Sequence, residues 1–145
     1  MDFMTALDIG GSSLSAQRTA LNVTSMNLAN AKTTRTLQGG PYQRKTVVFE
    51  STPVDTPFSS AMQTAMDRDT HGVKVLGIVN DDRPFRMQYE PGHPDADENG
   101  YVAYPDINVI EEMANLINVS RNYEASVTSI QSVKQMFSKA LAIGR

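Results

Sequence analysis

The most regular pattern in the chain is a row of positions spaced alternately four and three residues apart near its C-terminal end. Most of these positions are apolar or aromatic, and no proline interrupts them. Such spacing places side chains along one side of an α-helix and requires a partner along the same length. We therefore expect a helix over 107–143. Its stripe consists of Val109, Met113, Leu116, Ser120, Tyr123, Val127, Ile130, Lys134, Phe137 and Leu141.

A second, weaker pattern predicts a helix over 5–31. Leucine recurs there every seven residues, at Leu7, Leu14, Leu21 and Leu28. The intervening heptad positions are Gly11, Arg18 and Ser25. A stripe this narrow should pack against a stronger partner instead of forming a core alone. Glycine weakens a helix interior, so we expect Gly10–Gly11 to fray or bend the first turns.

The seven prolines all fall between residues 41 and 105, which separates two proline-free ends from an irregular or β-rich middle. Within the middle, the apolar runs at 46–49 and 73–79 are typical of strands. Alternation over 85–89 predicts a third, half-buried strand. These three strands would form one small sheet, and the polar stretch 51–71 is expected to be a mobile loop.

These patterns predict an α+β chain in three parts: an N-terminal coiled-coil helix (1–35), a β-rich middle domain (36–104), which the resemblance described below makes an outer domain, and a C-terminal coiled-coil helix (105–145). We expect the two helices to pair. The leucines of the first would then be buried against the stripe of the second. Because the second helix is longer, the rest of its stripe remains for other subunits. Within that stripe, Ser120 and Lys134 are either tolerated imperfections or the residues that fix register and partner choice.

Composition excludes several function classes. The chain has 145 residues, a formal net charge of -3 and no cysteine. This charge gives no reason to expect nucleic acid as a partner, and without cysteine there is no disulfide framework. The N-terminus has no basic leader followed by an apolar core, so we expect no conventional signal peptide. No stretch approaches the length of a membrane helix, and we expect no membrane insertion.

One local motif resembles a metal-binding loop. The positions in question are Asp95, Asp97, Asn99, Gly100 and Asp106. They match the ligand spacing of an EF-hand calcium loop. However, prolines stand where the entering helix should be, and the last position is Asp instead of the longer Glu. We favour a structural turn that joins the sheet to the C-terminal helix, and a calcium-regulated binding module is the weaker alternative.

The remaining residues give almost no support to an enzyme. The two histidines, His71 and His93, lie in glycine- or proline-flanked loops beside carboxylates, where a surface or turn role is more common than a metal or acid–base role. The sequence contains no nucleophile elbow, phosphate-binding glycine loop or paired-carboxylate motif. We therefore expect no catalytic residues and no cofactor.

Several segments resemble bacterial flagellar rod and hook proteins, and in particular the C-type proximal rod proteins of the basal body. The segments are Ser15–Arg18, Leu21–Val23, Asn27–Asn30 with Thr33 and Thr34, Tyr89–Pro105, Glu111–Ile117 and Arg121–Ala125. This likeness covers nearly the whole chain in order, and residues 51–71 match least clearly. Within that family the Asp95–Gly100 stretch belongs to the motif without a calcium role.

The resemblance implies a structural subunit of the flagellar rod. Such proteins leave the cytoplasm through the flagellar type III export apparatus without a cleaved signal peptide. In the periplasm they assemble with copies of themselves and related rod proteins into a helical tube that transmits torque to the hook. Their terminal helices form its inner coiled-coil layer, and Asn27 and Asn30 join the stripe residues as expected interface positions.

Two further expectations follow. A free monomer would leave the stripe in water, so we expect its termini to be largely disordered and to fold on assembly. The competing interpretation is a stand-alone coiled-coil adaptor or chaperone that binds another protein's helix through the same stripe. An adaptor would form a discrete dimer or trimer, whereas a rod subunit would stay monomeric or polymerise.

Overall fold

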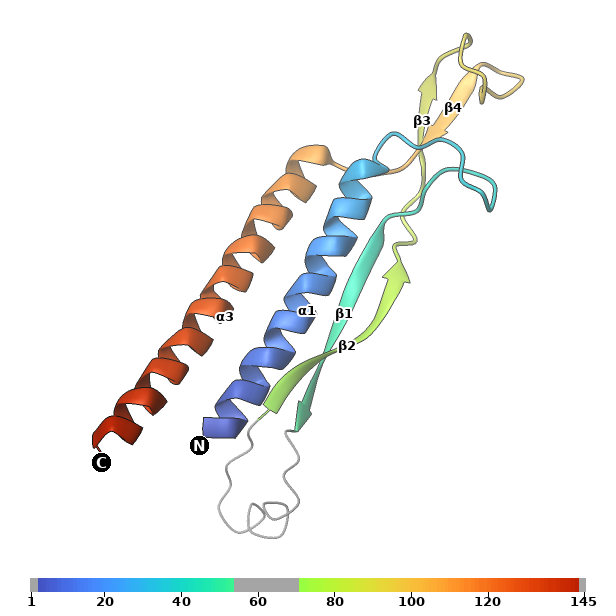
Figure 1. Ribbon diagram of the computed structural model, residues 1–145. Coiled ribbons are helices and arrows are strands. Elements are labelled where there is room, and N and C mark those ends of the chain that lie inside the picture. The colour runs from blue at the N-terminus through green and yellow to red at the C-terminus, as the bar shows by residue number, and fades with distance from the viewer. Residues whose placement is uncertain (1–2, 54–70, 144–145) are drawn as a thin grey trace. The chain divides into compact units, whose positions relative to one another are not determined.

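The computed structural model describes residues 3–53 and 71–143. Among these described residues the chain forms two long helices and four strands (Figure 1). In chain order the elements are α1 (Phe3–Ala29), β1 (Lys45–Pro53), β2 (His71–Asn80), β3 (Arg86–Tyr89), β4 (Tyr101–Tyr104) and α3 (Val109–Ile143). The predicted α+β class, with a helix at each end and a β-rich middle, is confirmed.

Both predicted helices are present. α1 begins and ends two residues earlier than predicted, and α3 begins two residues later. The start of α3 follows from its sequence, because the side-chain oxygen of Asn108 accepts a hydrogen bond of 3.1 Å from the backbone N–H of Ile110. Glu111 and Glu112 lie in the first turn, where the helix dipole favours negative charge. At the end of α1, the Asn30 side chain donates a hydrogen bond of 2.8 Å to the carbonyl of Met26.

The strands form two separate pairs, so the prediction of one three-stranded sheet was wrong. β1 pairs with β2, and β3 pairs antiparallel with β4. Sequence reasoning missed β4 because it directly follows the Asp- and Gly-rich stretch that we assigned to a turn. That turn joins β3 to β4, and it does not join the sheet to the C-terminal helix as expected.

The third strand was also expected to be half-buried, and its residues are exposed instead. The hairpin of β3 and β4 buries Val102 on one side and leaves Met87 and Tyr89 in solvent on the other. Both ends of the loop expected at 51–71 are strand instead, because residues 51–53 belong to β1 and His71 belongs to β2. Residues 54–70, on which the rest of that prediction falls, lie outside the described residues.

The chain divides into two compact units, which are described separately. The terminal unit comprises Met1–Thr19, Val48–Gly77 and Ser120–Arg145, and the hairpin unit comprises Ala20–Val47 and Ile78–Val119. The predicted division of the chain at residues 35 and 105 stays a prediction. None of the described helices is long and apolar enough to cross a membrane.

Most of the buried side chains lie in the hairpin unit. Its buried hydrophobic residues are Ala20, Val23, Tyr42, Val102 and Ile107, and its buried polar residues are Asn27 and Glu112. In the described part of the terminal unit, the buried hydrophobic side chain is that of Ala16. Along α1 the buried positions therefore follow the spacing 16, 20, 23 and 27, with small residues, while the four leucines of the heptad are only partly buried.

Candidate assembly interface

In the terminal unit, the first half of α1 and the second half of α3 lie side by side and run antiparallel. Phe3 stacks on Phe137 with ring centroids 4.0 Å apart. Further along, the hydroxyls of Ser13 and Ser126 are 3.2 Å apart and share a hydrogen bond. As the residue numbers rise along α1, those of their contacts fall along α3. These two segments therefore pack antiparallel to each other.

Gly10 is a point of close approach between these two helices. A Cβ added to Gly10 would lie 2.6 Å from Cγ1 of Ile130, whereas one added to Gly11 would meet nothing within 4 Å. The helix runs unbroken through both glycines, and the expected fraying or bending of its first turns stays a prediction. Gly10 lets the backbone of α1 approach the Ile130 side chain.

The opposite side of α1 faces the first sheet. The backbone N–H of Val73 in β2 donates a hydrogen bond of 3.2 Å to the hydroxyl of Ser12, which itself donates one of 2.8 Å to the carbonyl of Ile9. In this unit α1 therefore lies between α3 and the strands (Figure 1). Small residues on α1 allow both neighbours to pack closely against it.

The stripe predicted on α3 divides into a partly buried and an exposed set. Leu116, Ser120, Tyr123, Val127 and Ile130 are partly buried. Val109, Met113, Phe137 and Leu141 are between 41% and 59% exposed, and Lys134 is also exposed. The most buried residue of the helix is Glu112, one position before Met113. The face turned towards the protein is thus offset from the predicted stripe, and a row of apolar side chains remains in solvent.

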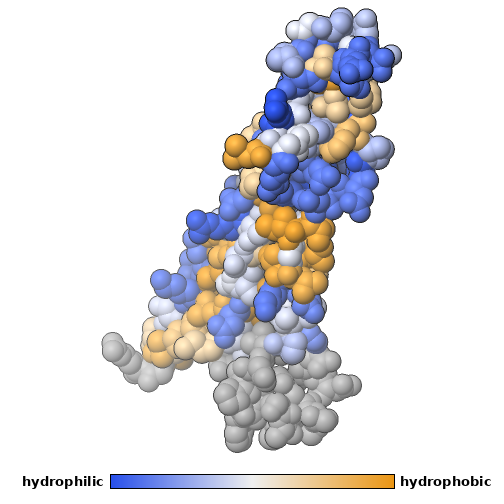
Figure 2. Space-filling view, turned by 90° about the vertical axis from the view of Figure 1, so that its right-hand side faces the viewer, coloured by the Kyte–Doolittle hydropathy of each residue, from blue (hydrophilic) through white to orange (hydrophobic). Residues whose placement is uncertain are grey.

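The sheet of β1 and β2 exposes apolar side chains as well. In the terminal unit these are Val48, Phe49, Val73 and Leu76. Figure 2, which looks at this side, shows a continuous hydrophobic area at the level of the strands. Large exposed apolar patches on a protein mark sites of protein–protein contact.

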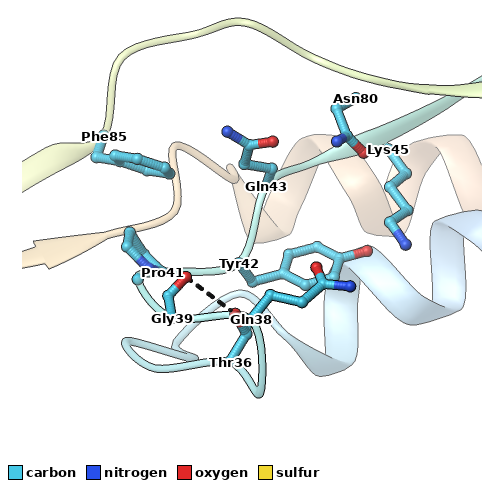
Figure 3. A pocket seen from close by; sticks show the side chains of 10 residues that line it. Thr36, Gln38, Gly39, Pro41, Tyr42, Gln43, Lys45, Asn80 and Phe85 are labelled. Atoms are coloured by element: carbon cyan, nitrogen blue, oxygen red, sulfur yellow. Dashed lines mark hydrogen bonds between the residues drawn. The ribbon is translucent and has the colours of Figure 1, made fainter.

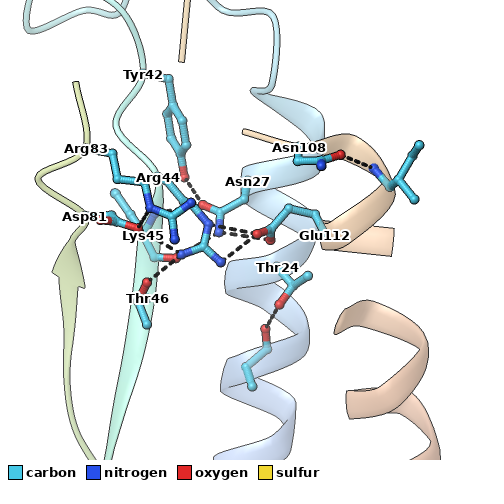
Figure 4. A network of polar contacts seen from close by, with 12 residues as sticks. Thr24, Asn27, Tyr42, Arg44, Lys45, Thr46, Asp81, Arg83, Asn108 and Glu112 are labelled. Carbon is cyan, nitrogen blue, oxygen red and sulfur yellow. Dashed lines mark hydrogen bonds and ion pairs between the residues drawn. The ribbon is translucent and has the colours of Figure 1, made fainter. Parts of the chain in front are cut away.

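In the hairpin unit, Asn27 connects the end of α1 to the start of β1. Its side-chain oxygen accepts a hydrogen bond of 2.9 Å from the N–H of Lys45, and its side-chain nitrogen donates one of 2.8 Å to the Lys45 carbonyl. The amide thus pairs with both backbone groups of Lys45, as a residue on a neighbouring strand would. The Tyr42 hydroxyl donates a further bond of 3.0 Å to the same oxygen (Figure 4).

Glu112 joins this cluster from α3. Its carboxylate receives a hydrogen bond of 2.8 Å from Nε of Arg44, forms a 2.7 Å ion pair with the same guanidinium, and accepts a 3.3 Å bond from Asn27. Arg44 also contacts Asp81 at 3.1 Å, and Arg83 pairs with the same Asp81 oxygen. Asn27 and Glu112 are 1% and 2% exposed. A buried carboxylate costs several kcal/mol of desolvation unless such partners compensate it.

Burial and the nearby charge affect the titration of two groups in the cluster. Burial raises the pKa of the Tyr42 hydroxyl above its usual value, and the negative charge of Glu112 raises it further. Burial alone would lower the pKa of Arg44. Its hydrogen bonds and charge interactions with Glu112 and Asp81 outweigh that effect and raise it. The guanidinium therefore stays positively charged at neutral pH.

Sequence reasoning singled out Asn27 and Asn30 and missed the partners of Asn27. Tyr42 and Arg44 follow the Gly–Gly–Pro turn, and Glu112 is 68 residues from Arg44 in the chain. No local pattern links such distant residues. The available signal was the carboxylate of Glu112, one position before Met113 of the predicted apolar stripe.

Asp95, the first position of the calcium-like loop, has a structural role. Its carboxylate accepts a 2.8 Å hydrogen bond from the Thr34 hydroxyl and lies 3.8 Å from Arg35. Its backbone N–H donates to Nδ1 of His93, whose ring lies edge-on to Tyr104. Asp97 closes the turn before β4 through backbone hydrogen bonds with Gly100 and Tyr101. Among the described residues, no group of three or more His, Cys, Asp or Glu side chains could hold a metal ion.

The hairpin unit has an open groove of about 510 Å³ beside the turn that follows α1. Thr36, Gln38, Tyr42, Gln43 and Phe85 are among its lining residues (Figure 3). The lining consists of amides, hydroxyls, aromatic rings and the backbone of the turn, with Lys45 as its charged side chain. It contains no pair of groups that could act as acid and base or as nucleophile and base.

Comparison with known proteins decides the family. Residues 7–35 match the model of the flagella basal body rod protein, and residues 98–143 match that of the C-terminal part of the flagellar basal body rod FlgEFG proteins. The chain is 39% identical to the flagellar basal-body rod protein FlgC of Salmonella typhimurium over 145 residues, which cover all of both chains. The chain belongs to the FlgC family of flagellar basal-body rod proteins.

Relatives from distant bacteria give the same result. FlgC of Borreliella burgdorferi is 39% identical over 150 residues, covering 99% of this chain and 98% of that protein. FlgC of Bacillus subtilis is 40% identical over 147 residues, covering 97% of each. The FlgC family is structural and not enzymatic, and nothing in these matches supports a stand-alone adaptor or chaperone.

Proposed function

We propose that this chain is a structural subunit of the proximal rod of the flagellar basal body, and that it assembles through its terminal helices. The observation that carries the proposal is the exposed half of the α3 stripe, at Val109, Met113, Phe137 and Leu141. Side chains of this kind at helical spacing form a surface for another helix. Membership of the FlgC family supplies the context in which that surface is covered.

The contacts within the terminal unit support helix pairing in the assembled protein. Phe3 with Phe137, Gly10 with Ile130 and Ser13 with Ser126 bring α1 and α3 together. We propose that this packing extends into a coiled coil that uses the leucine positions of α1 and the partly buried positions of α3. Ser120 and Lys134 would set the register of that packing, since polar residues at core positions disfavour shifted alignments.

The partners are other copies of this chain and related rod proteins. A contact between two different surfaces leaves one free surface on each outer subunit, so it extends into a helical assembly unless rotation closes it. Such an assembly of many subunits can transmit torque from the motor to the hook. The type III export apparatus would deliver the chain to the periplasm without cleaving a signal peptide, before the rod forms.

A pair of substitutions on α3 tests the proposal. Leu141→Asp places a carboxylate in the exposed row, and Ser138→Asp places one at an exposed polar position three residues away. Burying an unpaired charge in a helix interface costs several kcal/mol. In cells that lack their own copy, we expect Leu141→Asp to abolish motility and incorporation into basal bodies while the variant is still exported. Cells that carry Ser138→Asp should swim normally.

Purified basal bodies supply the deciding readout. If Leu141→Asp is recovered in them at the same level as the unsubstituted chain, the exposed row of α3 is not an assembly surface. If the unsubstituted chain itself is missing from them, the proposed rod function is wrong.

A further inference from the structure

On the hairpin of β3 and β4, one side carries the buried Val102 and the other carries exposed apolar and aromatic side chains. Residues paired across an antiparallel ladder share a side, and the register pairs Met87 with Ala103 and Tyr89 with Tyr101. Met87, Tyr89 and Tyr101 are 53%, 63% and 44% exposed, whereas Val102, on the other side, is buried. We call the exposed side, formed by Met87, Tyr89 and Tyr101, the tyrosine face.

The rings of the tyrosine face are held in place although they are exposed. Tyr89 and Tyr101 meet edge to face with centroids 5.4 Å apart. Gly100 adopts a φ of 79°, and a Cβ there would lie 2.9 Å from the Tyr89 ring. A backbone hydrogen bond of 2.9 Å from Glu90 to Gly100 closes the same turn. Ordered tyrosines lose little entropy on binding, which makes them effective anchors of a protein interface.

The hairpin is acidic, and another segment of the same chain is basic. Residues 86–104 contain one arginine and four aspartates or glutamates, while residues 32–45 contain four lysines or arginines and no acidic residue. Within the basic segment, Lys32 is exposed, whereas Arg44 already pairs with Glu112 and Asp81 of its own chain. Arg35 lies 3.8 Å from Asp95 of the same chain, but its side chain is 77% exposed. Opposite charges on two surfaces steer them together and suppress the contact of each with itself.

The basic segment also presents an apolar side chain. Leu37 is fully exposed, at the tip of a tight turn. That turn is held by backbone hydrogen bonds of 2.8 Å from Thr36 to Gly40 and 3.0 Å from Gly39 to Thr36. A leucine fixed in solvent on a closed turn gains free energy when a partner covers it.

We propose that the 36–40 turn of one copy binds the tyrosine face of a second copy, with Leu37 against the rings and the basic side chains beside it near the acidic hairpin. This inference rests on the proposed rod function, which brings copies together. The two surfaces differ, so each pairing leaves one of them free on either side. The contact therefore continues from copy to copy and does not close as a symmetric dimer.

Cysteine cross-linking in assembled basal bodies tests the contact, because the chain has no cysteine of its own. Two differently tagged copies are produced in one cell, one with Leu37→Cys and the other with Tyr101→Cys. A disulfide that joins both tags can only form between copies. The matched control replaces Leu37→Cys by Asp82→Cys, which is also exposed but lies between β2 and β3, outside the proposed surfaces. We expect at least about tenfold more mixed disulfide for Leu37→Cys with Tyr101→Cys than for the control.

Charge reversal is the second measurement. Lys32→Glu should weaken incorporation into basal bodies, and Glu98→Lys in the same chain should restore it, because each reversed charge then again faces its opposite. Circular dichroism of the purified variants monitors the fold independently.

Three outcomes would overturn the inference. In the first, both tagged copies are present in basal bodies and no mixed disulfide forms above the control. In the second, Leu37→Cys cross-links mainly to itself, which means that the turn meets the turn of another copy. In the third, Leu37→Cys cross-links to a different rod protein instead. Absence of the unsubstituted chain from basal bodies would instead contradict the proposed rod function.

Discussion

The two compact units bury their residues very differently. The hairpin unit contains five of the six buried hydrophobic side chains found among the described residues, together with the paired charges of Arg44 and Glu112. The terminal unit has long helical segments, yet its buried hydrophobic side chain in the described part is Ala16. Several of its apolar residues are exposed on α3 and on the strands. The hairpin unit thus has a buried interior of its own, whereas the terminal unit exposes apolar side chains like one side of a protein–protein interface.

We expect the largest effect from a substitution that removes the buried carboxylate of the hairpin unit. Glu112→Ala removes one of the two carboxylates that pair with the partly buried Arg44 guanidinium and leaves Asp81 as the other. It also removes the carboxylate that accepts a hydrogen bond from the Asn27 side chain. We expect a loss of about 3–5 kcal/mol in the free energy of unfolding, measured by urea denaturation of the purified chain. Glu111→Ala is the matched control, because Glu111 lies in the same first turn but is exposed.

The control separates the ion pair from the helix dipole. Both variants remove one negative charge from the start of α3, which costs about 0.3–1 kcal/mol. If Glu111→Ala and Glu112→Ala destabilise the chain equally, the polar cluster does not hold the hairpin unit together.

Asn27→Ala should have the next largest effect. Asn27 uses its oxygen for Lys45 and Tyr42 and its nitrogen for Lys45 and Glu112, so the alanine leaves buried partners unpaired. We expect a loss of about 1–3 kcal/mol by the same denaturation measurement. Asn22→Ala, at an exposed position of α1, should change stability by less than about 0.5 kcal/mol. Equal effects of the two alanines would show that the amide pairing with Lys45 contributes nothing.

Gly10 tests the terminal unit, where the effect should depend on assembly. Alanine favours a helix over glycine by about 1 kcal/mol, so Gly11→Ala should support assembly, since its methyl group meets nothing. Gly10→Ala forces its methyl group against Ile130 and should weaken assembly by about 1–3 kcal/mol. Swimming speed and basal-body content are the readouts. The penalty of Gly10→Ala should shrink in an Ile130→Ala background, and an unchanged penalty would mean that the two residues do not meet in the rod.

The smallest effect is a pH dependence of the hairpin unit. The pKa of Tyr42 is raised in the folded chain, by burial first and by Glu112 second. Its contribution to stability is therefore complete below the unfolded pKa of about 10 and is lost as pH rises through the folded value. Stability measured from pH 9 upward should fall more steeply for the unsubstituted chain than for Tyr42→Phe. Identical slopes would show that Tyr42 does not titrate in a buried site.

The sequence predicted the features that depend on local pattern. Both helices follow from repeats of three and four residues without proline, and Asn108 and Pro105 account for the point where α3 begins. Strands β1 and β2 were visible as apolar runs. The separation of the strands into two pairs was not predicted, because β4 is a four-residue strand beside a turn motif and its pairing with β3 is not local.

The candidate interface was predicted only in part, for a physical reason. A 4-3 spacing identifies an apolar face but does not state which neighbour covers it. On α3 the face turned towards the protein includes Glu112, which a hydrophobic pattern cannot find because its burial depends on Arg44, 68 residues away. On α1 the buried positions are small residues such as Ala16 and Ala20, whereas the leucines drew attention to a neighbouring row.

Amide hydrogen exchange of the purified monomer tests most directly whether the terminal unit depends on its neighbours. We predict strong protection around Ala20–Asn27 and around Glu112, where the hairpin unit has its buried core and polar cluster. Residues 5–19 of α1 and 120–141 of α3 should exchange rapidly in the monomer and become protected in assembled rods. Strong protection of residues 5–19 in the monomer would contradict the account, because the terminal helices would then fold without a partner.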